Sequence, residues 1–143
     1  QQIIKSEAVS LHIRRGDYVT DTHTNSVHGT CDVRYYKKAV MEVLKSKKQA
    51  HFFIFSDDLD WAESNLNFIN NKTFIRLESD IPDHEEMYLM SQCKYNIIAN
   101  SSFSWWGAWL NQNSDKKVIA PKKWFNGSVL NPKDLIPNSW VRL

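Results

Sequence analysis

Two adjacent arginines, followed by a glycine and an aspartate, carry the clearest chemical signal in this sequence. Arg14, Arg15, Gly16 and Asp17 come directly after residues 8–13, an apolar segment typical of a buried strand. In parallel sheets, functional groups gather where the strands end, and two guanidiniums suit a phosphate or diphosphate. The pattern therefore predicts a phosphorylated ligand. A surface salt-bridge network is the plainer alternative, and an Arg-Gly-Asp adhesion tripeptide is disfavoured because adhesion needs a protruding loop tip.

A second polar cluster, Ser56-Asp57-Asp58, follows the apolar residues 51–55. Serine and aspartate commonly cap helices, which is one interpretation. In the other, Asp57 or Asp58 accepts hydrogen bonds from the ribose or base of a nucleotide. Asp58 and Asp60 also have the Asp-x-Asp spacing that can hold Mg²⁺ or Mn²⁺, although three residues are weak evidence for a metal site.

A third cluster, Asn100-Ser101-Ser102, precedes a segment expected to be helical to about residue 111. Free amides and hydroxyls at the start of a helix form an anion site, and residues 95–114 contain no charged side chain that would repel an anion. Ordinary helix capping is the alternative for the serines. We expect the nearby tryptophans to lie mainly in the core, with one lining the crevice: Trp105, Trp106 and Trp109.

Other groups that often do chemistry are expected to be structural. His12 lies inside a strand, where a histidine is more often a hydrogen-bonded structural element than a proton carrier. The remaining histidines share no spacing typical of a metal site. Cys31 and Cys93 are expected to be reduced thiols, with Cys93 buried at the end of an apolar helical run.

Strand-like and helix-like patterns alternate along the chain. We expect strands at 8–13, 51–55, 73–77, 95–99 and 117–120, and helices at 33–47, 59–66, 82–92 and 102–111. Residues 19–30 are expected to be a polar loop, and those after 121 loops and short turns. This alternation predicts an α/β fold, a Rossmann-like doubly wound parallel sheet, in a single domain over 1–143.

Composition excludes several classes of partner. The net charge of +2 is too small to favour binding to nucleic acid or to an anionic membrane. The long uncharged run contains too many asparagines and serines for a membrane span. The first residues lack the apolar core of a signal peptide.

The three clusters, in this order, resemble segments of the alpha-1,2-fucosyltransferases of glycosyltransferase family 11. Residues 12–18 match the family's His-x-Arg-Arg-Gly-Asp-Tyr motif, and four further segments are similar: 55–58 with Trp61, 86–93, 100–110 and 118–124. The resemblance implies a GT-B enzyme that transfers L-fucose from GDP-fucose to the 2-hydroxyl of a galactose-terminated glycan, with inversion and without a metal or other cofactor. The lack of an anchor and of a signal peptide fits a bacterial cytoplasmic location, at the inner face of the membrane.

The resemblance also assigns roles to residues. Arg14 would hold the diphosphate and assist catalysis, with Arg15 supporting it. The rest of the GDP-fucose site would comprise His12, Asp57, Asp58, Asn100, Ser101 and Ser102. Asp17 is the nearest candidate for the general base, although the neighbouring guanidiniums should weaken it in that role.

One family feature is missing from the sequence. The amino-terminal Gly-Gly-Leu-Gly-Asn-Gln-Met-Phe segment is absent, so the resemblance covers only the carboxyl-terminal, nucleotide-binding half. We therefore expect little or no turnover by this chain alone. Two alternatives to a metal-independent fucosyltransferase are a nucleotide-binding module without catalytic activity and a metal-dependent transferase that uses Asp58 and Asp60.

Overall fold

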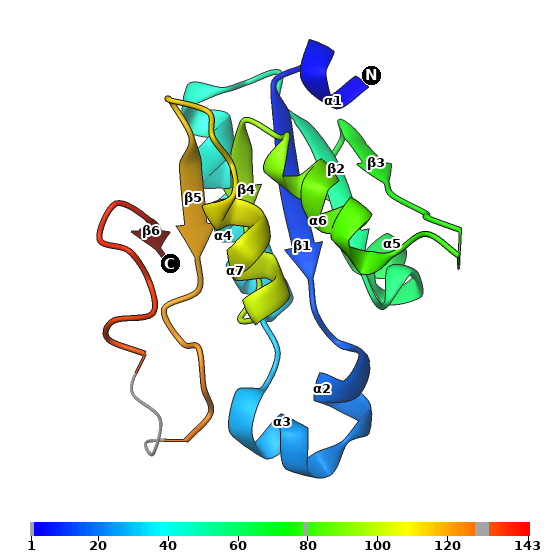
Figure 1. Cartoon of the computed structure of the whole chain (residues 1–143), viewed down its shortest axis with the longest axis vertical. Coiled ribbons are helices and arrows are strands. Elements are labelled where there is room, and N and C mark those ends of the chain that lie inside the picture. The colour runs from blue at the N-terminus through cyan, green and yellow to red at the C-terminus, as the bar shows by residue number, and fades with distance from the viewer. Residues whose placement is uncertain (1, 79, 128–131) are drawn as a thin grey trace.

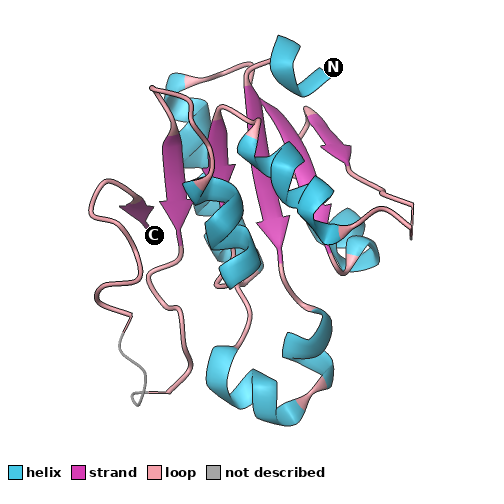
Figure 2. Cartoon of the chain, viewed as in Figure 1, coloured by secondary structure: helices cyan, strands magenta, loops and turns pink. Residues whose placement is uncertain are grey.

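A parallel sheet with helices on both faces is the frame of this computed structural model, which describes residues 2–78, 80–127 and 132–143 (Figures 1 and 2). Within those residues the strands are β1 (Ala8–Ile13), β2 (His51–Ser56), β3 (Lys72–Phe74), β4 (Tyr95–Ile97), β5 (Lys117–Ala120) and β6 (Val141–Arg142). The helices are α1 (Gln2–Lys5), α2 (Gly16–Thr20), α3 (Thr22–His28), α4 (Val33–Ser46), α5 (Leu59–Asn65), α6 (Asp83–Ser91) and α7 (Ser102–Trp109).

The strands follow the order β3-β2-β1-β4-β5-β6, and all neighbouring pairs are parallel. This is the strand order of the Rossmann fold, so the predicted doubly wound α/β sheet is confirmed. The order reverses between β1 and β4, which pair through Val9 with Tyr95 and Leu11 with Ile97. In such sheets a crevice for ligands opens beyond the carboxyl ends of the strands at this reversal.

The central strand β1 is buried on both faces. Val9, Leu11 and Ile13 belong to the larger core cluster, in which Tyr36 and Val40 of α4 also lie. Figure 1 shows α6 and α7 in front of the sheet and α4 behind it. Because both faces are covered, β1 is buried at every position and is largely apolar, with Ser10 and His12 as its polar residues.

Aspartates start several of the helices. Asp21, Asp32 and Asp58 accept hydrogen bonds from backbone N–H groups in the first turns of α3, α4 and α5, at 2.6, 2.9 and 3.0 Å. Each bond satisfies one of the donors that a helix start leaves unpaired. For Asp58 the capping interpretation is therefore confirmed.

The structure corrects several boundaries. The polar loop predicted over 19–30 is wrong, because these residues contain the end of α2 and all of α3. The short elements α1 and β6 were not predicted. Two strands end earlier than expected, since β3 stops at Phe74 and β4 at Ile97.

Other expectations concern buried side chains. Cys31 and Cys93 are free thiols and Cys93 is buried, as predicted; Cys31 is buried as well. Trp106 and Trp109 are about half exposed, at 49% and 50%, and no tryptophan among the described residues lines the crevice at the strand ends, so the expectation of a mainly buried group with one member at the crevice is wrong. Across the described ranges, no helix combines the length and apolar character needed to cross a membrane.

Candidate functional site

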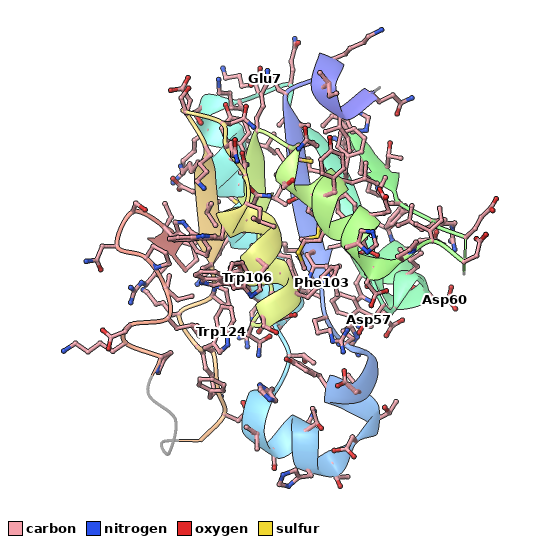
Figure 3. All side chains as sticks on the ribbon, in the orientation of Figure 1. Glu7, Asp57, Asp60, Phe103, Trp106 and Trp124 are labelled. Carbon is pink, nitrogen blue, oxygen red and sulfur yellow. The ribbon has the colours of Figure 1, made fainter. Side chains whose placement is uncertain are left out.

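A cleft of about 670 Å³ opens at the carboxyl ends of β1 and β2, beside the start of α7. Residues from all three polar clusters line it: His12, Arg14, Asp17, Asp57, Ser101 and Ser102. Figure 3 shows Asp57 and Phe103 toward this end of the sheet, with Glu7 at the opposite end. A slightly larger hollow of about 720 Å³ lies along α1 and α6, but no residue of the three clusters lines it. The candidate site is therefore the cleft at the strand ends.

Arg14 is held at the cleft by two carboxylates. Its Nη2 donates to Asp17 Oδ1 at 2.8 Å, and its Nε lies 3.3 Å from Asp57 Oδ2. The side chain is still 34% exposed. Asp57 also accepts a hydrogen bond from the Arg15 backbone N–H at 2.8 Å. The guanidinium is thus positioned before any ligand arrives, with part of its surface open to the cleft.

Arg15 has a different environment from Arg14 and does not line the cleft. Its Nε donates to Asp58 Oδ2 at 3.2 Å, and its guanidinium lies 4.3 Å from the centre of the Trp61 ring. Asp58 at the same time caps α5. These contacts tie the β1–α2 turn to the start of α5, so Arg15 and Asp58 support the position of Arg14.

Gly16 is required by the close approach of Asp57. A Cβ atom at Gly16 would lie 2.7 Å from Asp57 Oδ2, nearer than non-bonded atoms tolerate. The absence of a side chain lets the carboxylate reach both the Arg15 backbone and the Arg14 guanidinium. The Arg-Arg-Gly-Asp motif and the Ser-Asp-Asp cluster therefore form one interlocked unit.

The first turn of α7 contributes donors to the cleft. Ser101 is the N-cap residue, but its hydroxyl makes no capping hydrogen bond. Ser101 and Ser102 both line the cleft. The partial positive charge of the helix start and its unpaired N–H groups favour an anion at this position.

Asn100 is buried and does not line the cleft. Its side-chain amide donates to the backbone carbonyls of His28, Gly29 and Trp124, at 2.9, 3.2 and 3.1 Å. Its Oδ1 accepts from the Cys31 thiol at 3.6 Å. Asn100 thus connects the end of β4 to the loops that follow α3 and β5.

His12 faces the cleft in an unusual state. Its side chain is 3% exposed, and its Nδ1 is buried without a hydrogen-bond partner, contrary to the expectation of a hydrogen-bonded structural histidine. Burial, aided by the Arg14 charge, lowers the pKa of His12 from 6.5 to about 3. The imidazole is therefore neutral at pH 7.

Sequence reasoning did not identify the acidic wall of the cleft, which α6 supplies. Asp83 and Glu86 line the cleft opposite the α2–α3 segment, which adds Tyr18 and His28. Burial, followed by the nearby Asp83 and Asp57 charges, raises the pKa of Glu86. No spacing in the sequence signals this wall, because the packing of α6 beside α7 places it.

The described residues hold no grouping of three or more His, Cys, Asp or Glu side chains suited to a metal ion. Asp58 is engaged by Arg15 and by the α5 cap, and Asp60 lies in the first turn of α5. Neither residue lines the cleft.

Comparisons with known proteins agree with the family that the sequence motifs resemble. The profile of Glycosyl transferase family 11 matches residues 2–143. Two Escherichia coli proteins, O-antigen biosynthesis glycosyltransferase WbnK and alpha-1,2-colitosyltransferase, are 42% and 41% identical over 96% of this chain, which covers 45% and 48% of their lengths. Human galactoside alpha-(1,2)-fucosyltransferase 1 is 24% identical over 71% of the chain and 28% of its own length. The chain belongs to glycosyltransferase family 11.

Proposed function

We propose that this chain is the donor-binding part of an alpha-1,2-fucosyltransferase, which transfers L-fucose from GDP-fucose to the 2-hydroxyl of a galactoside with inversion. The observation that carries the proposal is the cleft at the strand-order reversal, where Arg14 and the start of α7 converge. The Rossmann-like sheet fits one domain of a GT-B glycosyltransferase. The names of the relatives, a colitosyltransferase and fucosyltransferases, support transfer of a 6-deoxy sugar.

The diphosphate of the donor fits the centre of the cleft. Arg14 offers a positioned guanidinium, and Ser101 and Ser102 offer hydroxyls beside the N–H groups of α7. As the bond to fucose breaks, negative charge grows on the departing GDP. These groups would stabilise that charge in a metal-independent reaction.

The guanosine fits the acidic side of the cleft. Asp83 and Glu86 would repel a phosphate, but carboxylates accept hydrogen bonds from the N–H groups of guanine or the hydroxyls of ribose. The neutral His12 adds a polar side chain to the lining of the cleft. Asp57 contributes chiefly by holding Arg14, and its position at the cleft leaves it within the donor site.

The acceptor hydroxyl needs a base as it attacks. Asp17 remains the proposed group, since it lines the cleft and is half exposed. Its Oδ1 is already engaged in a 2.8 Å ion pair with Arg14, so contact between Asp17 and an acceptor hydroxyl requires that this pair be shared or broken.

This chain spans less than half the length of the bacterial relatives. Acceptor transfer is accordingly proposed for the whole protein, and we expect little or no transfer to lactose by these 143 residues alone. Assaying the chain with GDP-fucose and lactose separates an active transferase from a domain that only binds the nucleotide.

Calorimetric titration with GDP tests the donor site. A charged hydrogen bond contributes about 1.5–3 kcal/mol, so Arg14→Ala should weaken GDP binding by about 10- to 100-fold. Arg34→Ala is the matched control, because Arg34 is highly exposed and pairs with Asp32 outside the cleft. Equal GDP affinity in wild type and Arg14→Ala would refute the diphosphate assignment. Binding that requires Mn²⁺ and is lost in EDTA would instead favour the metal-dependent alternative.

A further inference from the structure

Another hollow, of about 450 Å³, continues from the donor cleft along α7. It shares Tyr18, His28 and Ser102 with the cleft. Beyond these shared residues its walls are largely aromatic, formed by Trp105, Trp106 and Phe125. We call this hollow the aromatic groove. None of the described residues that line it carries a formal charge, in contrast to the acidic and cationic donor cleft.

The tryptophans of the aromatic groove are held in place. Trp105 Nε1 donates to the Leu135 carbonyl at 2.9 Å, and the Trp105 ring stacks on Trp109 at 5.0 Å. Trp106 meets Trp105 edge-on, with ring centres 5.0 Å apart, and remains 49% exposed (Figure 3). An exposed indole beside a fixed aromatic wall is typical of a binding surface.

His28 stands where the aromatic groove and the cleft meet. Its ring stacks on Tyr18 at 4.8 Å and lies 5.6 Å from Phe125. Its Nδ1 is buried and has no hydrogen-bond partner among the described residues, a state shared there with His12 Nδ1. Buried polar atoms are nearly always paired, so an unpaired one beside a hollow points to a missing ligand.

We propose that the aromatic groove holds the acceptor saccharide, with its galactose ring against Trp106 and a hydroxyl on His28 Nδ1. This inference rests on the proposed function. A pyranose presents an apolar C–H face, which suits the negative face of an indole, and a rim of hydroxyls that needs a few polar partners. The uncharged walls favour a neutral sugar over a nucleotide diphosphate.

The aromatic groove is continuous with the donor cleft, so a sugar bound in the groove would lie close to the donor. Ser102 lines both hollows, and Tyr18 connects the aromatic groove to Arg14, whose guanidinium lies 5.5 Å from the Tyr18 ring centre. A sugar in the groove would therefore lie next to the diphosphate end of the donor. That is the side on which a fucosyl group would be exposed to attack.

The test uses lactose as the probe and the indole N–H signals of the whole chain in a proton–nitrogen correlation spectrum. Lactose should shift the Trp106 signal, and Trp106→Ala should weaken lactose binding at least 10-fold without changing GDP affinity. Tyr88→Ala is the matched control: Tyr88 is also an aromatic residue about half exposed, at 57%, but it lines neither the groove nor the donor cleft. It should leave both affinities unchanged.

A second variant addresses the polar contact. His28→Phe keeps an aromatic ring beside Tyr18 but removes Nδ1, so it should weaken lactose binding. Lactose that does not bind the wild type, or that binds all variants equally, would overturn the inference. Loss of GDP binding in Trp106→Ala would assign the groove to the nucleobase instead. Failure of the wild type to bind GDP would refute the proposed function separately.

Discussion

Replacing His12 with phenylalanine should make the protein less sensitive to acid while damaging the donor site. The side chain is fully buried, and its Nδ1 has no partner, so a phenyl ring of similar size loses no hydrogen bond at that nitrogen. At pH 7.5 the variant should therefore be at least as stable as the wild type. Its GDP affinity should fall, because the polar contact proposed for His12 is lost.

The size of the pH effect follows from the shifted pKa. Folding lowers the pKa of His12 from 6.5 to about 3, since burial disfavours the charged ring. Below pH 6.5 the unfolded chain takes up a proton that the folded chain does not, so the stability present above pH 6.5 is lost as the pH falls toward 3. One pKa unit corresponds to about 1.4 kcal/mol, and the interval from pH 6.5 to 5 therefore removes about 2 kcal/mol.

Urea unfolding at pH 7.5 and pH 5 measures this effect. The difference in unfolding free energy between His12→Phe and the wild type should grow by about 2 kcal/mol in favour of the variant at pH 5. The other histidines are present in both proteins and largely cancel in the comparison. Parallel pH dependences would refute the conclusion that His12 is neutral and desolvated in the folded state.

Three further changes test the connections around the cleft. Asn100→Ala leaves three carbonyls without their donor and should lower the unfolding free energy by about 3 kcal/mol in urea, whereas the exposed Asn67→Ala should be nearly neutral. Gly16→Ala should destabilise by about 1–3 kcal/mol and weaken GDP binding in calorimetry, because the new Cβ displaces Asp57; unchanged binding would contradict that role. Glu86→Gln should stabilise the fold at pH 8, since the raised pKa penalises the carboxylate, and the gain should vanish below pH 4.5; a less stable variant at pH 8 would count against a desolvated Glu86.

The sheet and the cationic part of the site could be predicted because their signals are local. Largely apolar segments at β1 and β2 marked strands buried on both faces, and the polar residues immediately after them had to emerge at one edge. Arg14, Asp57 and Ser101 were thereby placed together correctly from sequence order alone. Parallel strands end at the same edge of the sheet, so the residues that follow them lie close together.

The remaining parts of the site depend on packing that leaves no periodic pattern. α3 contains no buried residue, so no apolar repeat distinguished it from a loop. The acidic wall depends on the approach of α6 to α7, where a Cβ at Gly107 would lie 2.8 Å from the end of Met90. Whether Trp106 faces the core or solvent likewise depends on which face of α7 meets the sheet.

The position of β1 at the centre of the sheet also determines the order in which the fold can form. β1 comes first along the chain, yet its two neighbours are β2, which begins at residue 51, and β4, which begins at residue 95. Until β4 has been synthesised, one edge of a largely apolar strand has no partner. Such an edge is a template for aggregation, and pairing across this sequence distance is slow. Any fragment that ends before residue 95 should therefore need a chaperone or a foreign strand to remain soluble.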